Sequence, residues 1–246
     1  MKLSKLLMTV AVSFLVATVS HAADSASISG KITFDGKPPK QKKIPTIADP
    51  KCEEMHADSP LLTEEVMVNA DGTLKNVFVY VKSGLGDKTY DAPNIPVELT
   101  QTGCHYVPHV FGMMAKQPLK IVNGDDTLHN IHATPTKNQE FNMAQPNKGM
   151  IKVLSKSSTP QTFAQPEVMV RFKCDVHPWM SAYVGILNNP FYSVTGDNGT
   201  FTLKGLPAGE YEIVAWQEKY GEQVQKIKIG DGEAKTVNFK FSIPTE

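Results

Sequence analysis

The chain has 246 residues, enough for one large or two modest domains, and 41% of them are hydrophobic, which excludes wholesale disorder. Its 25 basic and 25 acidic side chains balance, so the charge gives no indication of nucleic acid or an anionic membrane surface as a partner. Seventeen glycines and seventeen prolines favour a turn-rich β protein over a helical one.

Residues 1–22 have the pattern of a secretory signal peptide. Lys2 and Lys5 form a basic start, residues 6–19 form an apolar run, and Ser20-His21-Ala22 offers small residues at a cleavage site. The apolar run is short for a transmembrane span, and no stop-transfer pattern follows it. We therefore expect export to the periplasm, cleavage of the signal, and no membrane span after processing.

The three cysteines, Cys52, Cys104 and Cys174, are an odd number for an exported protein. Export places a chain in an oxidising compartment, where cysteines pair. The simplest account is one disulfide and one thiol with another task.

Most of the remaining chain is typical of short β-strands separated by turns. Residues 27–34 alternate apolar and polar side chains, and residues 76–82 are apolar on both faces. Residues 40–63 carry Lys, Pro and Asp without periodicity and predict a long loop. Further strands are expected near residues 97–100, 118–122, 168–173, 182–187, 200–204, 211–216 and 237–241. We predict an all-β fold with little helix.

A stretch near the middle of the chain places three metal-ligand types within seven residues: Cys174, His177 and Met180. Thiolate, imidazole and thioether are the ligands that a soft, redox-active metal such as copper prefers. Apolar side chains alternate along residues 168–174, and side chains two apart on a strand share a face. We therefore expect the sulfur of Cys174 to point inward.

The segment around His129 can supply a second imidazole. Strand parity places His129 on the same face as Ile131, while Asn130 and His132 lie on the opposite face. We predict metal ligation by His129 rather than His132. Asn130 is expected to tether the two ligand segments by hydrogen bonds, a supporting role common at metal sites.

Two further residues of the ligand loop are expected to support the site. Pro178 stiffens the loop by fixing its own φ. Trp179 is positioned to shield the metal from water.

Together, His129, Asn130 and the run from Cys174 to Met180 resemble the cupredoxins, in particular the amicyanin and plastocyanin type. The resemblance implies a Greek-key β-sandwich over about residues 76–190 and one type 1 copper ion held by His129, Cys174, His177 and Met180. It implies an electron carrier rather than an enzyme, with redox partner proteins in the periplasm. His177 is then expected near the surface, in an apolar patch where the electron leaves.

Three other interpretations remain open. The protein could be a periplasmic copper carrier or storage protein that uses the additional His and Met residues. A copper enzyme would need a second copper centre with several more histidines, and no His-x-His pair occurs in the sequence. A structural or adhesion protein with a degenerate site is disfavoured by the intact ligand set, and zinc is disfavoured because Met is a poor zinc ligand.

Cys52 and Cys104 are expected to form the disulfide, which would fasten the 40–63 loop to the sandwich. The alternative is an accessory metal cluster that uses Cys104 with His105 and His109. No alternation places these residues on one face, which favours the disulfide.

Residues 197–211, Asp-Asn-Gly-Thr-Phe-Thr-Leu-Lys-Gly-Leu-Pro-Ala-Gly-Glu-Tyr, resemble the carboxypeptidase regulatory-like (transthyretin-like) β-sandwich module. The first strand typical of that module is missing just upstream, and residues 28–39 look like it instead. We expect a signal peptide at 1–22, an N-terminal strand and loop at 23–75, a cupredoxin domain at 76–190 and the regulatory-like module at 191–246. Insertion of the cupredoxin domain into this module and two tandem domains are both open.

Overall fold

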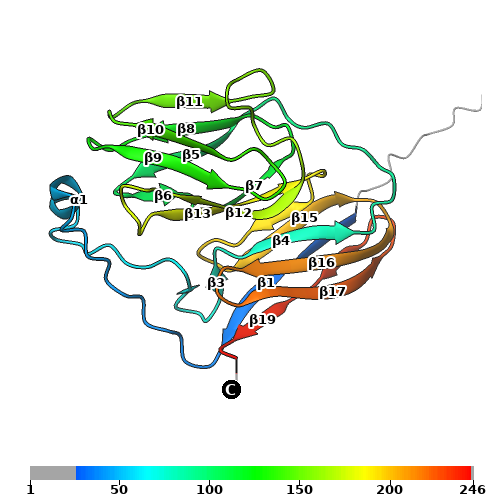
Figure 1. The fold of residues 1–246 in the computed structure, drawn as a ribbon. Coiled ribbons are helices and arrows are strands. Elements are labelled where there is room, and N and C mark those ends of the chain that lie inside the picture. Colours follow the sequence, from blue (N-terminus) through cyan, green and yellow to red (C-terminus); the bar gives the residue numbers. More distant parts are fainter. Residues whose placement is uncertain (1–25, 245–246) are drawn as a thin grey trace, which may run out of the picture.

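A computed structural model describes residues 26–244, so the expected signal peptide at 1–22 lies outside the described part of the chain. That part contains nineteen strands and one short helix, and seventeen of the strands form two β-sandwiches, one above the other in Figure 1. The prediction of an all-β fold is confirmed. No helix among residues 26–244 has the length and apolar character needed to cross a membrane.

The upper sandwich in Figure 1, here the central sandwich, is built from residues 97–187. Its five-stranded sheet runs in the order β10 (Phe141–Gln145), β9 (His129–Thr134), β12 (Glu167–Lys173), β13 (Ser181–Leu187), β7 (Val110–Met114). Its four-stranded sheet runs in the order β11 (Ile151–Leu154), β8 (Leu119–Asn123), β5 (Val97–Thr102), β6 (His105–Val107). Apolar side chains from both sheets form one buried core, which includes Leu99, Ile121, Ile131, Phe172 and Val184.

The lower sandwich, here the terminal sandwich, has two four-stranded sheets. In one, β1 (Ala26–Asp35) lies between β15 (Thr200–Leu206) and β18 (Ala234–Thr236) and also pairs with β19 (Phe239–Ser242). The other runs in the order β14 (Tyr192–Val194), β4 (Phe78–Ser83), β16 (Gly209–Gln217), β17 (Gly221–Ile229). The alternation of Val237, Phe239 and Phe241 reflects their burial in the core between these sheets.

The terminal sandwich takes strands from both ends of the chain. Antiparallel pairing joins β1 to β15, and β4 pairs with both β14 and β16. The expected domain boundary at residue 76 therefore does not follow the sheets, because residues 78–83 form hydrogen bonds with the C-terminal strands. Apolarity on both faces of this strand reflects two buried surfaces: Val79 and Val81 face the terminal core, while Phe78 and Tyr80 face the central sandwich.

Two glycines allow the sandwiches to approach each other closely. A Cβ atom at Gly185 of β13 would lie 2.3 Å from the ring of Phe78, and one at Gly112 of β7 would lie 2.4 Å from the ring of Tyr192. Contacts this short are not sustained between non-bonded carbon atoms. Glycine at both positions therefore lets the aromatic rings of the terminal sandwich pack on the backbone of the central one.

Residues 36–66, here the covering loop, leave the terminal sandwich after β1 and reach the side of the central sandwich (Figure 1). They contain the helix α1 (Pro50–Met55), which begins at the N-cap Asp49 with proline at its first position. The chain then returns through the hairpin of β2 (Met67–Val68) and β3 (Leu74–Lys75) to β4. A disulfide joins Cys52 of α1 to Cys104, which confirms the expected pairing.

Candidate metal centre

Three buried side chains of the central sandwich converge on one point. His129 opens β9, Cys174 directly follows β12, and His177 lies three residues later. The Nδ1 atoms of His129 and His177 are 3.0 Å apart, and the sulfur of Cys174 is 3.7 Å from Nδ1 of His177. All three residues are buried, and their candidate ligand atoms lie within 4.8 Å of one another.

The loop from Cys174 to Met180 is closed by its own backbone. The Cys174 N–H donates to the carbonyl of Met180 at 3.3 Å, and the Met180 N–H donates to the carbonyl of His177 at 2.9 Å. The His177 N–H also donates to the Cys174 sulfur at 3.4 Å. Met180 is fully buried in the apolar core that also contains Cys174. The closed loop thus directs Cys174 and His177 to the same point.

Asn130 joins β9 to this loop across 45 residues of sequence. Its side-chain oxygen accepts a hydrogen bond from the Asp175 N–H at 2.7 Å and lies 3.2 Å from the Cys174 sulfur. His132 faces the other way, with its ring nitrogens 2.9 Å from Asp175 and 2.7 Å from Glu140. Strand parity therefore assigned the inward and outward histidines correctly.

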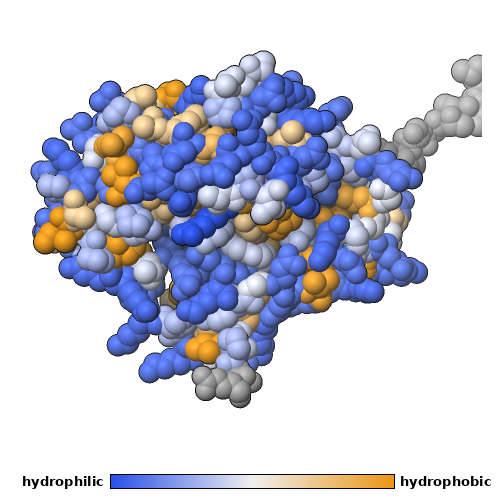
Figure 2. Space-filling view, viewed as in Figure 1, coloured by the Kyte–Doolittle hydropathy of each residue, from blue (hydrophilic) through white to orange (hydrophobic). Residues whose placement is uncertain are grey.

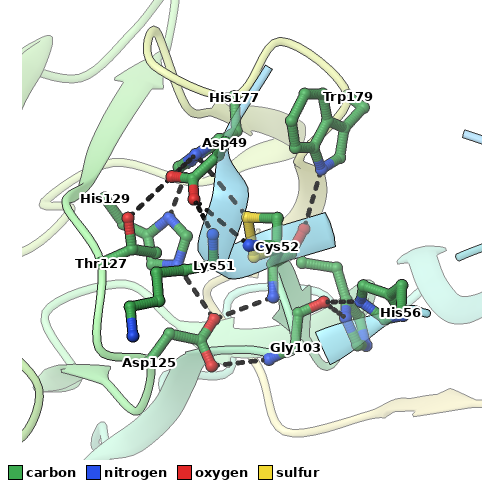
Figure 3. Close-up of a disulfide and its surroundings, with 12 residues drawn as sticks. Asp49, Lys51, Cys52, His56, Gly103, Asp125, Thr127, His129, His177 and Trp179 are labelled. Carbon is green, nitrogen blue, oxygen red and sulfur yellow. Dashed lines mark hydrogen bonds and ion pairs between the residues drawn. A yellow bond between two sulfur atoms is a disulfide. The ribbon is translucent and has the colours of Figure 1, made fainter. Parts of the chain in front are cut away.

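Each inward histidine has a carboxylate behind it, on the side away from the sulfur of Cys174. Nε2 of His129 is 2.9 Å from Asp125, and Nε2 of His177 is 2.9 Å from Asp49. Dashed lines mark both contacts in Figure 3. Asp125 accepts from the backbone N–H groups of Gly103 and Cys104, both at 2.8 Å. These hydrogen bonds hold the Asp125 carboxylate in place, and the hydroxyl of Thr127 donates to Asp49 at 2.7 Å.

Hydrogen bonds to Asp49 and Asp125 keep both carboxylates ionised. Burial alone would raise the pKa of Asp49, but hydrogen bonds from Thr127, His177 and backbone N–H groups lower it to about 2. The pKa of Asp125 is lowered as well, since hydrogen bonds from His129 and the backbone outweigh the effect of burial. Each carboxylate therefore accepts the Nε2–H of its histidine, which leaves Nδ1 as the free ligand atom.

Sequence reasoning missed both carboxylates. Asp125 is only four residues before His129, but no strand pattern aims its side chain at the imidazole. Asp49 lies 128 residues from His177 in a segment predicted only as a loop. Its one local indication is the Asp49-Pro50 pair, which is typical of a helix start.

The electrostatics of the cluster favour a bound cation. With both Nε2–H groups donated to carboxylates, neutral imidazoles present two Nδ1 lone pairs to each other at 3.0 Å. Such a contact is repulsive unless a proton or a metal ion lies between the nitrogens. The pKa of His129 is raised to about 9, because the hydrogen bond with Asp125 and the nearby Cys174 outweigh burial.

The surroundings of Cys174 lower the pKa of its thiol and so favour the thiolate. Burial alone would raise its pKa, but hydrogen bonds from His129, His177 and backbone N–H groups lower it to about 6. Cys174 is also the one cysteine outside the disulfide. At neutral pH the site therefore holds a thiolate, and a metal ion that binds there takes the place of the proton held by His129.

This set of side chains fits a single copper ion. Ligand atoms that share one ion through bonds of about 2.0–2.3 Å lie roughly 3–4 Å from one another. The measured separations of 3.0 and 3.7 Å fall in that range. A buried plane of one thiolate and two imidazoles is the arrangement that copper electron-transfer sites use.

The expectation that His177 lies near the surface is wrong. Its exposed fraction is 1%, because the covering loop lies over it. Asp49 hydrogen-bonds its Nε2 atom, and the Cys52 sulfur lies 3.8 Å from the same atom (Figure 3). Trp179 packs on the imidazole with ring centroids 5.0 Å apart. The disulfide between Cys52 and Cys104 fastens this cover in place.

His105 and His109 have separate hydrogen-bond partners and do not share a candidate metal site. Nδ1 of His105 is 3.0 Å from the carbonyl of Gly103, whereas His109 pairs with Glu218 at 2.6 Å. Among residues 26–244, the groups of three His, Cys, Asp or Glu ligands within 4.8 Å include neither histidine. Both instead line one cavity, together with Trp179.

Comparisons with known proteins return two kinds of similarity. The model of the carboxypeptidase regulatory-like domain matches residues 177–242. A copper-containing nitrite reductase from Thermus scotoductus SA-01 is 18% identical over 42% of this chain and 24% of its own, with a TM-score of 0.33. The match thus spans about a quarter of the nitrite reductase.

Two smaller solved structures are matched over almost their whole length. A purple cupredoxin from Nitrosopumilus maritimus is 17% identical over 36% of this chain and 97% of its own, with a TM-score of 0.29. A Cu(I) amicyanin variant is 15% identical over 44% of this chain and 97% of its own, with a TM-score of 0.31. No curated protein sequence is significantly similar. The family model thus matches residues 177–242 alone, and the likeness to the three solved structures stays below a TM-score of 0.5.

Proposed function

We propose that the protein binds one copper ion as a type 1 centre and carries single electrons between redox partners without being an enzyme. His129, Cys174 and His177 would hold the ion, with Met180 as a weaker fourth ligand. The observation that carries the proposal is the convergence of one thiol of lowered pKa and two Nδ1 atoms at one buried point. When bound, copper supplies a one-electron couple between Cu(II) and Cu(I).

The surrounding residues hold the ligands in one arrangement for both oxidation states. Asp125 and Asp49 fix the histidine tautomers, and such partners orient ligand rings and raise their basicity. Asn130 fixes the ligand loop against β9. A rigid, buried site changes little when an electron arrives, which favours fast transfer.

Burial of the ligands favours electron transfer over catalysis. A substrate would need an open coordination position within reach of solvent, yet His129, Cys174 and His177 are at most 1% exposed. An electron needs no such opening. The cover over His177 also disfavours the copper-carrier alternative, because a metal that is handed over needs an exit.

We further propose an exported, periplasmic location. The Cys52–Cys104 disulfide supports an oxidising compartment, and the pattern of residues 1–22 supports a cleaved signal.

Cyclic voltammetry of the copper-loaded protein tests the function. Electron transfer predicts a reversible one-electron wave with one copper per chain and no metal loss over repeated cycles. Ready transfer of Cu(I) to a chelator such as bathocuproine disulfonate, on the time scale of mixing, would support the carrier instead. The His132→Ala variant is the matched control, since that histidine lies outside the proposed ligand set and should leave both results unchanged.

A further inference from the structure

A cavity of about 380 Å³ lies beside the covered histidine. Its walls come from the covering loop, from the loop that carries Trp179 and from the turn that follows β16. We call it the Trp179 cavity. The residues that matter for its chemistry are Lys40, Lys42, Leu62, His109, Trp179 and Glu218.

Trp179 connects this cavity to the proposed metal site. It lines the cavity and is only partly buried, whereas His177 is 1% exposed. The two rings pack with centroids 5.0 Å apart. The indole N–H donates to the carbonyl of Cys104 at 3.0 Å, which fixes the ring against the disulfide. Trp179 is thus an aromatic contact between solvent and a proposed ligand.

The charges around the cavity are uneven. Its acidic side chains face cationic groups: Glu65 pairs with Lys219 at 3.0 Å, and both Glu218 and Glu64 lie within 3.7 Å of His109. Burial alone would lower the pKa of His109, but its contacts with these two glutamates raise it.

Lys40 and Lys42, in contrast, are exposed and have no ion-pair partner within residues 26–244. Lys37 and Lys43 extend this basic segment along the same part of the covering loop.

Exposed apolar side chains lie next to the lysines. Leu62 lines the Trp179 cavity and is 41% exposed, and Ile47 lines a neighbouring groove with Lys43 and is 73% exposed. Figure 2 shows apolar surface among hydrophilic residues at the end of the molecule where Figure 1 places α1. Apolar contacts with a charged rim are typical of protein interfaces.

We propose that the Trp179 cavity and its lysine rim form the docking site for an acidic electron-transfer protein, with Trp179 in place of an exposed histidine as the point where the electron crosses. The inference rests on the proposed function. Partner carboxylates meet Lys40 and Lys42, which steer the encounter. One electron leaves the reduced protein and enters the oxidised partner, and no bond is made or broken.

The docking site can be tested without copper. In the metal-free, disulfide-intact protein, the paramagnetic anion hexacyanochromate(III) should broaden NMR amide signals first at residues 40–43 and at the Trp179 indole. The Lys40→Glu/Lys42→Glu variant should lose this effect. The matched control is Lys88→Glu/Lys204→Glu, which reverses two exposed lysines outside the cavity and should retain it. Broadening that is uniform, or centred away from the covering loop, overturns the docking site whether or not copper binds.

The role of Trp179 is tested on the copper-loaded protein by stopped-flow oxidation with hexacyanoferrate(III). Trp179→Leu should slow oxidation about tenfold with an unchanged visible spectrum, and Trp179→Phe should restore most of the rate. The double lysine variant should slow oxidation by this anion about tenfold as well, but not by the cationic tris(phenanthroline)cobalt(III). Equal rates for wild type and Trp179→Leu, or equal slowing with both oxidants, would contradict the proposal.

Discussion

Asp49 accepts a hydrogen bond from Nε2 of His177 at 2.9 Å, although 128 residues separate them in the chain. This contact brings a carboxylate from the covering loop to a proposed ligand. The Asp49 carboxylate also occupies the edge of the His177 ring that solvent would contact if this histidine were exposed. The covering loop therefore acts on the proposed metal site in two ways, by orienting His177 and by sealing it.

Asp49→Asn should weaken metal binding and raise the reduction potential. Asparagine still caps α1, but the negative charge that favours the more positive oxidation state is lost. Removal of a partner behind a metal ligand typically costs about 10–100-fold in metal affinity. Competition titration and voltammetry measure both effects. Asp58→Asn, an exposed position on the same loop, is the control, and equal affinities for the two variants would contradict this role.

The Cys174 thiol should ionise at a pH far below that of an ordinary cysteine. Its pKa is lowered to about 6, since hydrogen bonds from both histidines and the backbone outweigh burial. The thiolate is thus present above about pH 6, and protons compete with metal below it. The ultraviolet absorbance of the thiolate follows the titration in metal-free protein, with Cys174→Ser as the blank. A midpoint at or above the ordinary 9.0 would contradict the arrangement.

Removal of the disulfide should destabilise the fold and uncover His177. The cross-link spans 52 residues, and in the chain-entropy model a loop of that size is worth about 4 kcal/mol. Chemical denaturation of Cys52→Ser/Cys104→Ser measures the loss. Diethyl pyrocarbonate labelling with mass spectrometry should find His177 protected in the wild type and modified in the variant. Protection in both proteins would mean that the loop stays closed without its tether.

Gly185→Ala should weaken the joint between the two sandwiches. The new methyl group would lie 2.3 Å from the Phe78 ring, and overpacking of this kind costs about 1–3 kcal/mol. Gly196→Ala is the control, because a Cβ there meets no atom within 4 Å. The second substitution Phe78→Leu should recover part of the loss in Gly185→Ala. Thermal unfolding measures all four proteins, and equal stability of the two alanine variants would rule out close packing here.

The sequence predicted those features that depend on local alternation. Strand parity distinguished His129 from His132, and the odd cysteine count left Cys174 unpaired. The two carboxylates could not be predicted, because tertiary packing brings Asp49 and Asp125 to the histidines. The cover over His177 escaped prediction for the same reason: residues 36–66 carry no periodic pattern, and their position is set by the disulfide and by contacts distant in sequence.

The place of residues 78–83 shows another limit of local patterns. Apolarity on both faces indicated a central strand, but it could not indicate which sheet. In the structure this strand pairs with β14 and β16 of the terminal sandwich. Local sequence could not predict this, because the partner strands lie far away in the chain.

Visible and EPR spectra of the copper-loaded protein test the central claim most directly, measured beside Cys174→Ser, His129→Ala and His132→Ala. The account predicts an intense thiolate-to-copper band in the wild type and in His132→Ala, and its loss in Cys174→Ser and His129→Ala. A colourless wild type, or a Cys174→Ser variant that keeps the band, would contradict it.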